Sequence, residues 1–297
     1  MSHILVSGSI AYDVIMNFHD QFGKYILPDQ TKSISVCFNV QELSKHDGWA
    51  GHNIAYNLGL LWEKALLLGA VGSDFVASEF NEKHIDYRYT YTSAWLLTPS
   101  AHIITDDENN QITAFYPGAS IESGQQSVHN VKEAVKIAIV APNAPSTMLK
   151  HLKECETLNI PVIFDPGQPL TAFSKEQLHE ALTASNYLIV NEYEKNLLCS
   201  LADIDEASLL NRVEAYIVTL GAQWSTFVSS EETFTVPAYA PANVKDPTGA
   251  GDAFRAGVLW SLFEDKGWKA GMEMGSQLAW NCVQEYGTQN HQLWVAE

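Results

Sequence analysis

Basic residues are scarce in this 297-residue chain, which has 17 lysines and arginines against 35 aspartates and glutamates. The resulting formal charge of −18 argues against a nucleic-acid or anionic-membrane partner, because such partners attract positive protein surfaces. No apolar run reaches the roughly 18 residues that a membrane-spanning helix needs. The first residues also lack the pattern of a secretory signal peptide. We therefore expect a soluble, cytoplasmic protein.

Several common motifs are missing as well. The four cysteines are far apart and form no Cys-x-x-Cys pair, which predicts reduced thiols and no zinc site or disulfide framework. No Gly-x-x-x-x-Gly-Lys-Ser/Thr loop is present, which argues against a P-loop enzyme. The segment Gly8-Ser-Ile-Ala-Tyr-Asp13 lacks Gly-x-Gly-x-x-Gly, so a Rossmann dehydrogenase is a poor fit.

Hydrophobic residues make up 46% of the chain, enough for a substantial core. Short apolar runs predict strands at 4–10, 65–71, 137–141, 162–165, 187–191 and 216–220. Helical periodicity lies between them, near 52–62, 74–84, 145–158, 175–184, 192–200 and 206–212. This alternation predicts an α/β fold with a doubly wound, mostly parallel sheet, in one domain spanning 1–297.

Two stretches interrupt the alternation, at 14–46 and 87–118. They contain β-branched and aromatic segments without a helix, such as those at 33–38 and 89–95. The polar residues 106–110 predict a hairpin turn. We expect these stretches to form a small separate sheet that acts as a lid. The alternative is that they are extra edge strands of the main sheet.

An acidic residue follows a run of small residues in Gly249-Ala250-Gly251-Asp252, before an apolar segment with helical spacing. Backbone N–H groups at a helix N-terminus attract anions. A carboxylate beside such a site suits a general base that takes a proton from a nucleophile attacking a phosphate. The alternative is an ordinary glycine-rich turn with an acid at a helix start.

The longer string Asp246-Pro-Thr-Gly-Ala-Gly-Asp252-Ala-Phe resembles the C-terminal signature of the ribokinase (PfkB) family of sugar and nucleoside kinases. The resemblance covers nearly the whole chain. Three segments look specifically like bacterial adenosine kinases: Gly8 to Asp13, Asn110 to Ala119, and Gly287-Thr-Gln-Asn-His291. It implies ATP-dependent phosphorylation of a ribose 5′-hydroxyl, with adenosine converted to AMP. The alternatives are a broad nucleoside or pentose kinase and a non-catalytic nucleotide sensor.

The acceptor site implied by the resemblance lies in the N-terminal part of the chain. Asp13 would bind sugar hydroxyls. Gly48-Trp-Ala-Gly51-His-Asn53 resembles the family's N-terminal signature, in which glycines allow close backbone approach and Asn53 offers a ribose hydroxyl both a donor and an acceptor. Trp49 stands where the family commonly has a second glycine, so it either narrows the sugar pocket or reroutes the turn.

Two residues are candidates for contact with a purine base. Phe115, on an expected lid strand, could stack on the base, with packing inside the lid as the alternative. Gln168, in Asp165-Pro-Gly-Gln168, could hydrogen-bond the edge of the base.

The nucleotide side is implied by three further matches. Asn191-Glu-Tyr-Glu194 matches the family's Asn-x-x-Glu motif, in which Glu194 would organise Mg²⁺ through water. Its alternative is a helix start with acids in the first turn. Thr219 and Gly221 end an expected strand at the nucleotide, although Trp224 replaces a glycine there.

Three residues of the C-terminal third have weaker assignments. Asn281 is a candidate nucleotide contact, with an exposed helix asparagine as the alternative. Asp246 could help to bind a monovalent cation such as K⁺, or could only shape a turn. Arg255 is a candidate second cation at the phosphates, or a structural residue on the helix surface. We expect a monomer or a homodimer.

Overall fold

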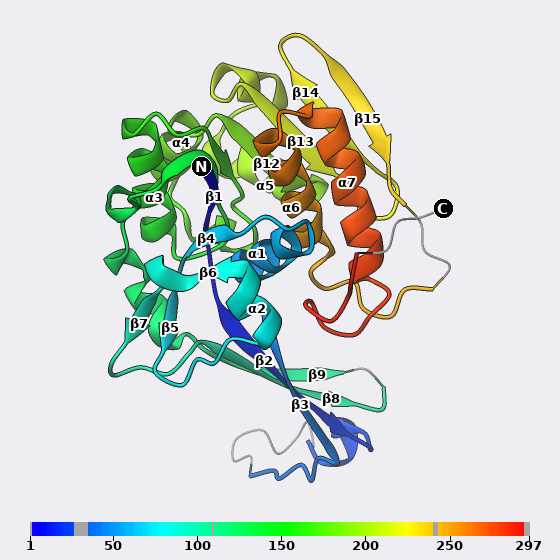
Figure 1. Ribbon diagram of the computed structural model, residues 1–297. Coiled ribbons are helices and arrows are strands. Elements are labelled where there is room, and N and C mark those ends of the chain that lie inside the picture. Colours follow the sequence, from blue (N-terminus) through cyan, green and yellow to red (C-terminus); the bar gives the residue numbers. More distant parts are fainter. Residues whose placement is uncertain (1, 27–34, 109, 240–242, 294–297) are drawn as a thin grey trace.

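The computed structural model describes residues 2–26, 35–108, 110–239 and 243–293, and within them nine strands form the central sheet (Figure 1). Their spatial order is β15-β14-β13-β12-β11-β10-β1-β4-β6. The strands are β1 (Ser2–Ser7), β4 (Ala65–Leu68), β6 (Ile85–Asp86), β10 (Ala134–Val140), β11 (Val162–Phe164), β12 (Tyr187–Asn191), β13 (Ala215–Thr219), β14 (Trp224–Ser229) and β15 (Thr233–Pro237). All neighbours from β6 to β13 are parallel, whereas β14 and β15 are antiparallel.

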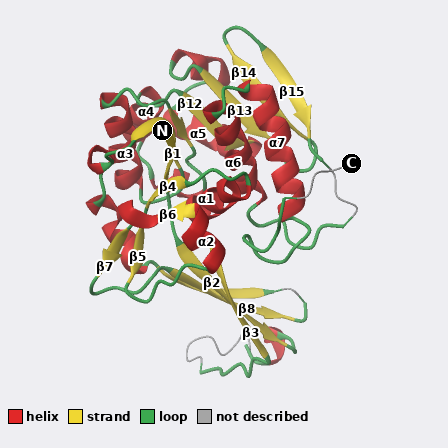
Figure 2. Ribbon diagram, viewed as in Figure 1, coloured by secondary structure: helices red, strands yellow, loops and turns green. Residues whose placement is uncertain are grey.

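Helices cover both faces of this sheet (Figure 2). They are α1 (Ala50–Leu60), α2 (Glu79–His84), α3 (Pro145–Thr157), α4 (Lys175–Thr183), α5 (Glu192–Ala202), α6 (Ala250–Phe263) and α7 (Gly267–Cys282). Alternate residues of β1 enter different cores: Ile4 and Val6 pack with residues of α1, α6 and α7, and Leu5 packs with residues of α3, α4 and α5. The predicted doubly wound, mostly parallel sheet is therefore confirmed.

A second sheet is separate from the first. Its order is β3-β2-β8-β9, built from β2 (Ala11–Phe18), β3 (Glu42–Gly48), β8 (Ser100–Asp106) and β9 (Gln111–Tyr116). Figure 1 shows it projecting below the main body, as a continuation of the direction of β1. We call these four strands the small sheet. The alternative that the two interrupting stretches are edge strands of the main sheet is wrong.

The turn between β8 and β9 is organised by Asp106. Its carboxylate accepts hydrogen bonds from the backbone N–H groups of Phe22, Glu108 and Asn110. These bonds hold the pKa of Asp106 below its usual value, although desolvation opposes them. The predicted hairpin at 106–110 is present because the acid at its start satisfies the free amides of the turn.

Two expected strands of the small sheet lie elsewhere or are absent. In the segment 89–95, only β7 (Tyr91–Ser93) is a strand, and it pairs with β5 (Ala70–Gly72) in a two-stranded sheet. In the segment 33–38, the first two residues lie outside the described part of the chain and 35–38 form no strand. Phe38 instead packs its ring on Phe18 and Phe22, at centroid distances of 5.0 and 4.9 Å.

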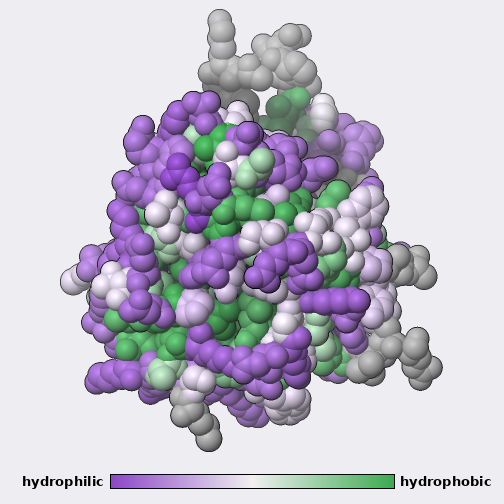
Figure 3. Space-filling view, turned by 90° about the horizontal axis from the view of Figure 1, so that it is seen from above, coloured by the Kyte–Doolittle hydropathy of each residue, from purple (hydrophilic) through white to green (hydrophobic). Residues whose placement is uncertain are grey.

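The expected helix at 206–212 is a 3₁₀ helix, Glu206–Asn211. Across the described ranges, no helix is both long and apolar enough to cross a bilayer. Seen from above, hydrophilic side chains cover much of the molecule, with smaller hydrophobic areas between them (Figure 3).

Candidate active site

The candidate residues gather at one edge of the main sheet. β1, β12 and β13 run in the same direction, so their carboxyl ends meet at this edge. Ligands of open parallel sheets bind at the carboxyl ends of the strands. The chain passes from β1 through residues 8–10 directly into β2, which places the root of the small sheet beside the same edge.

Helix α6 begins here with a conformation that requires glycine. Gly249 is its N-cap residue, with φ = 82°, and a Cβ atom on Gly249 would lie 2.8 Å from Cγ2 of Thr288. The first N–H groups of an α-helix have no partner within the helix. The start of α6, with Ala250 and Gly251 in its first turn, can therefore present amide groups to an anion.

Asp252 lies in this first turn and is fixed by a buried asparagine. Nδ2 of Asn53 donates a hydrogen bond to Oδ2 of Asp252 over 2.8 Å. Burial raises the pKa of Asp252 to about 6, while Arg255 and the Asn53 hydrogen bond limit the rise. The carboxyl group thus titrates close to neutral pH, which suits a general base.

The amide of Asn53 is itself oriented by the loop after α7. Its Oδ1 accepts hydrogen bonds from Oγ1 of Thr288 over 2.8 Å and from Nε2 of Gln289 over 3.0 Å. Since two donors occupy the carbonyl oxygen, the amide nitrogen must face Asp252. Sequence reasoning did not assign Thr288 or Gln289 to the site, although both lie in the singled-out segment Gly287 to His291.

These bonds change the expected role of Asn53. We expected its side chain to offer both a donor and an acceptor to a ribose hydroxyl, but the protein itself occupies the acceptor and part of the donor capacity. A carbonyl oxygen has two lone pairs, and both are used here. Asn53 therefore positions Asp252, and only its remaining amide hydrogen is free to meet a substrate.

Arg255 is buried, which corrects the expectation of a residue on the helix surface. Its Nη2 donates to Oδ1 of Asp165 over 2.7 Å, and Nε lies 2.5 Å from Oδ2. Nη1 also donates to the carbonyl oxygen of Gly251 over 3.0 Å. Burial raises the pKa of Asp165 and the guanidinium opposes this rise. The ion pair thus ties the start of α6 to the end of β11.

Asp13 lies on β2 at the root of the small sheet. Oδ1 of Asp13 accepts a hydrogen bond from Nε1 of Trp49 over 3.2 Å. Burial raises the pKa of Asp13, while Trp49 and His46 oppose the rise. Gly48 ends β3 so close to this carboxylate that an added Cβ atom would lie 2.8 Å from Oδ2.

A chain of contacts connects Asp13 with Asp252. Gly48 lies against Asp13, and Oγ1 of Thr288 lies 3.2 Å from the backbone carbonyl oxygen of Asp47, the residue before Gly48. Thr288 in turn bonds Asn53, which bonds Asp252. A continuous series of contacts thus joins the two acids.

The first turn of α1 packs tightly on the end of β1. A Cβ atom on Gly51 would lie 2.7 Å from the backbone of Gly8, so neither position has room for a side chain. This contact places the N-terminus of α1 beside the edge where the other candidates gather. It accounts for the glycine at position 51.

Trp49 is held in a backbone conformation that is otherwise almost confined to glycine. Its φ and ψ are 76° and 153°, a region that costs a non-glycine residue about 1–3 kcal/mol. The indole ring stacks on Phe115 of β9, with ring centroids 4.8 Å apart and an angle of 18° between the planes. The turn is not rerouted away from the site, because Trp49 reaches both Asp13 and the small sheet.

Asn191 and Glu194 form a reciprocal capping box at the start of α5. Oδ1 of Asn191 accepts from the backbone N–H of Glu194 over 2.8 Å, and Oε2 of Glu194 accepts from the backbone N–H of Asn191 over 2.9 Å. Glu194 also shifts the pKa values of Asp252 and Arg255 through its charge. The charge of Glu194 therefore lies near the start of α6.

The other candidates on the nucleotide side are more dispersed. Thr219 ends β13 and the exposed Gly221 follows it with φ = 58°. Trp224 begins β14 and is 42% exposed, so its ring is not packed into the core. Asn281 is buried in α7 and lines a cavity of about 370 Å³, which corrects the expectation of an exposed helix asparagine.

Asp246 lies beside the site, whereas no contact of the described residues joins Gln168 to it. The carboxylate of Asp246 accepts hydrogen bonds from the backbone N–H groups of Thr248 over 2.9 Å and Gly287 over 3.1 Å. Asp246 thus joins the loop before α6 to the loop after α7. Gln168 begins the 3₁₀ helix Gln168–Ala172 and is exposed. In the described part of the chain, no group of three or more His, Cys, Asp or Glu residues could hold a metal ion.

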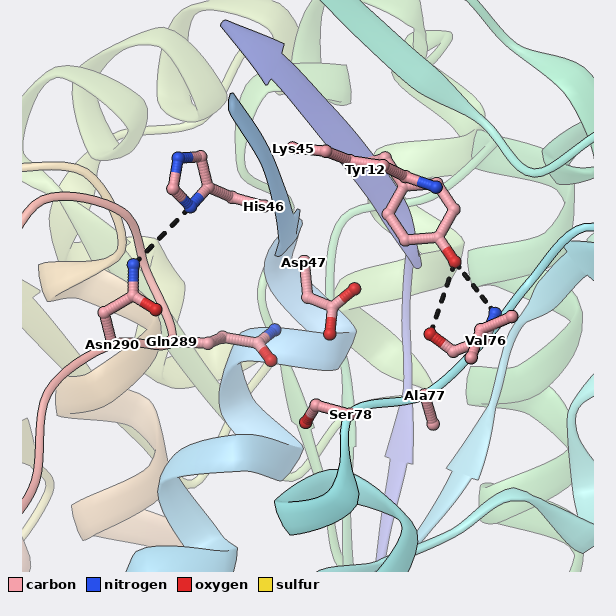
Figure 4. Close-up of a pocket in the computed structure, with 9 residues that line it drawn as sticks. All are labelled: Tyr12, Lys45, His46, Asp47, Val76, Ala77, Ser78, Gln289 and Asn290. Atoms are coloured by element: carbon pink, nitrogen blue, oxygen red, sulfur yellow. Dashed lines mark hydrogen bonds between the residues drawn. The ribbon is translucent and has the colours of Figure 1, made fainter. Parts of the chain in front are cut away.

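A cavity of about 390 Å³ lies between β3, the segment 76–78 and the loop after α7 (Figure 4). Gln289 lines this cavity and contacts the site through Asn53. Nζ of Lys45 lies 3.3 Å from the centroid of the Tyr12 ring, and burial raises the pKa of Asp47. The cavity is polar and contains groups of both charges.

Comparisons with known proteins agree with this geometry. A curated nucleoside kinase from Methanocaldococcus jannaschii is 34% identical over 87% of this chain and 83% of its own length. A ribokinase from Bacillus subtilis is 25% identical over 97% of this chain and 95% of its own. A structure of Burkholderia thailandensis nucleoside kinase in complex with inosine has a TM-score of 0.84, at 32% identity, and covers 97% of this chain and 93% of that one.

The sequence pattern of the family described as pfkB family carbohydrate kinase matches residues 1–295. The fold, the small sheet and the relatives all agree with this match. The chain is therefore a kinase of the PfkB family.

Proposed function

We propose that this kinase transfers the γ-phosphoryl group of ATP to the 5′-hydroxyl of a purine nucleoside. The observation that carries the proposal is the chain of contacts from Asp13 to Asp252, because it joins an acceptor-binding carboxylate to a base at a helix start. Relatives named nucleoside kinase support a nucleoside acceptor. The sequence resemblance favours adenosine, and the Burkholderia relative binds inosine.

Asp252 would accept the proton of the 5′-hydroxyl as that oxygen attacks the γ-phosphorus atom. The amide groups around Gly249, Ala250 and Gly251 would stabilise charge on the phosphoryl group during transfer. Asn53 holds the carboxylate in place for this step. The small sheet, placed beside the site, would exclude water and so limit hydrolysis of ATP.

Asp13 would bind the sugar hydroxyls and hold the ribose in line with the phosphoryl donor. Gly48 and Gly51 leave room for the sugar and for the packing of α1 on β1. Phe115 would stack on the base. Gln168, exposed on its short helix, would contact the base edge.

The nucleotide would lie along the ends of β12 and β13. Thr219, Gly221, Asn191 and Asn281 would contact it, as the family resemblance implies. Glu194 has the hard oxygen donors that suit Mg²⁺ and its charge lies near the start of α6, so it would hold the ion through water. When bound, Mg²⁺ neutralises charge on the donor phosphates. A relative has been solved in complex with ADP-inosine, which agrees with an adenine nucleotide as the donor.

Asp246 is our proposed contact for a monovalent cation such as K⁺. Both of its oxygens already accept loop amides, so its remaining lone pairs would serve the ion. The same residue shapes the loop before α6 in the structure.

The proposed function is tested by measuring ADP release with ATP, Mg²⁺ and a panel of nucleosides and pentoses. Adenosine and inosine should be phosphorylated with a higher kcat/KM than ribose. Preference for ribose would instead assign the chain to the ribokinase branch that its 25% identical relative represents. No phosphorylation of any acceptor, despite binding of ATP and nucleoside, would indicate a nucleotide sensor.

We expect Asp13→Ala to raise KM for the nucleoside strongly and to leave KM for ATP nearly unchanged, because Asp13 contacts only the acceptor. Initial rates measured with each substrate varied in turn would check this. Asn17→Ala, at the exposed far end of the same strand, is the matched control and should behave as the wild type. An effect confined to ATP would show that the acceptor site lies elsewhere.

The rate should depend on pH through Asp252. Burial raises its pKa to about 6, and the base must be deprotonated, so activity should fall as the pH drops through this value. Below it, kcat/KM should decrease about tenfold for each pH unit. A profile of kcat/KM between pH 4.5 and 8 at about constant ionic strength would test the expectation. The residual rate of Asp252→Asn should not show this decrease at low pH.

A further inference from the structure

Trp49 occupies a strained position at the junction of three elements. It follows the last residue of β3 and is the N-cap residue of α1, where its side chain makes no capping hydrogen bond. Its φ of 76° and ψ of 153° belong to a region that few residues other than glycine adopt. Such a conformation persists only where the surroundings fix it, so the contacts of its side chain indicate what it is for.

Two contacts fix the indole. Nε1–H donates to Oδ1 of Asp13 on β2, over 3.2 Å, and the ring stacks on Phe115 of β9 with 4.8 Å between centroids. Phe115 is 48% exposed, so the pair forms an aromatic surface that solvent or a ligand can reach. One side chain thus orients the acceptor carboxylate and supplies a flat apolar surface beside it.

The aromatic surface formed by Trp49 and Phe115 adjoins Asp13, because Trp49 is hydrogen-bonded to this carboxylate. This step rests on the proposed function, in which Asp13 binds the vicinal hydroxyls of a ribose. In a nucleoside, the carbon that carries the 2′-hydroxyl is bonded to C1′, and C1′ carries the base. A base on C1′ is therefore close to the carboxylate that binds the sugar hydroxyls, and the indole contacts this carboxylate directly.

We propose that Trp49 is a specificity-determining residue that selects acceptors with a planar heterocycle on C1′ over free pentoses. The base stacks on the surface formed by Trp49 and Phe115, whereas a free pentose has nothing to place there. The indole N–H has a different effect. It orients Asp13 toward the hydroxyls, which nucleosides and pentoses share.

The two contributions can be separated by two substitutions. Trp49→Phe keeps an aromatic ring but removes the N–H donor, so it should lower kcat/KM for nucleoside and pentose by similar factors. Trp49→Gly removes both and also relieves the backbone strain. It should lower kcat/KM for inosine about tenfold or more relative to ribose, since stacking on a base is lost.

The experiment compares inosine and ribose as acceptors in the wild type and both variants. The matched control is Trp62→Gly, because Trp62 also has a positive φ, of 63°, but is 83% exposed and lies beyond the C-terminal end of α1, whereas Trp49 precedes its first residue. In Trp62→Gly, the ratio of kcat/KM for inosine to kcat/KM for ribose should equal that of the wild type. Phe115→Leu, on the exposed side of the stack, is the substitute if Trp49→Gly fails to fold, and should shift the ratio in the same direction.

Calorimetric titration with inosine and with ribose, without ATP, makes the result independent of turnover. A larger loss of affinity for inosine than for ribose in Trp49→Gly supports the proposal even if the wild type transfers no phosphoryl group, and that failure would refute only the proposed function. Equal losses for inosine and ribose in Trp49→Gly would overturn the selection by Trp49. So would unchanged inosine affinity in this variant, or a wild type that does not bind inosine.

Discussion

Asp252→Asn is expected to lower kcat by at least about 10²-fold, because the amide cannot accept the proton of the attacking hydroxyl. Binding of the nucleoside should change little, since the substitution keeps the shape of the side chain. Initial rates and nucleoside titration on the same preparations would measure both quantities. In this variant, the decrease in kcat/KM at low pH should also be absent.

Asp265→Asn provides the matched control for this result. Asp265 lies just beyond the other end of α6 and forms an exposed ion pair with Lys136, which contributes about 0–1 kcal/mol to stability. Its kcat should equal that of the wild type. Near-normal turnover in Asp252→Asn would remove the general-base assignment and leave Asp252 as a residue of the helix start.

Arg255→Met should be the most destabilising substitution considered. It leaves the carboxylate of Asp165, which is only 1% exposed, without its partner. Removal of one partner from a buried ion pair costs about 3–5 kcal/mol. Urea unfolding of the wild type and the variant at the same pH would give the loss in free energy of unfolding.

Two further variants make the interpretation specific. The double substitution Asp165→Leu/Arg255→Met should recover much of the lost stability, because no unpaired charge stays buried. Arg88→Met should cost at most about 1 kcal/mol, because Arg88 pairs with Asp86 and Glu133 on the surface. If Arg255→Met is no more destabilising than Arg88→Met, the buried pair does not anchor α6.

Much of the fold could be predicted from local sequence because its strands are short, apolar and regularly spaced. The continuous apolar runs of β10 and β12 are typical of parallel strands covered on both faces. The segment 89–95 was assigned to the wrong sheet, because β-branched and aromatic residues indicate a strand but do not indicate the strand with which it pairs. Its pairing with β5, and not with β2 or β8, depends on contacts that no local pattern specifies.

The site was predictable to the extent that function requires particular residue types at close spacing. Gly249 and Asp252 are three positions apart, and the roles that we propose for them follow from the start of a helix. By contrast, Asn53 contacts Thr288 and Gln289 across more than 200 positions, so the occupation of its carbonyl oxygen by these two donors could not be inferred. The burial of Arg255 could not be inferred for the same reason, since its partner Asp165 is 90 positions away.

The long sequence separation within the contact network affects how the enzyme matures. Asn53 is separated by 235 residues from Thr288, and closing so long a loop is slow compared with forming the helices on either side of it. A refolding chain can therefore regain its helical circular dichroism before the carboxylate of Asp252 has been oriented. Catalytic competence is consequently a late marker of maturation, acquired only when distant parts of the polypeptide have docked.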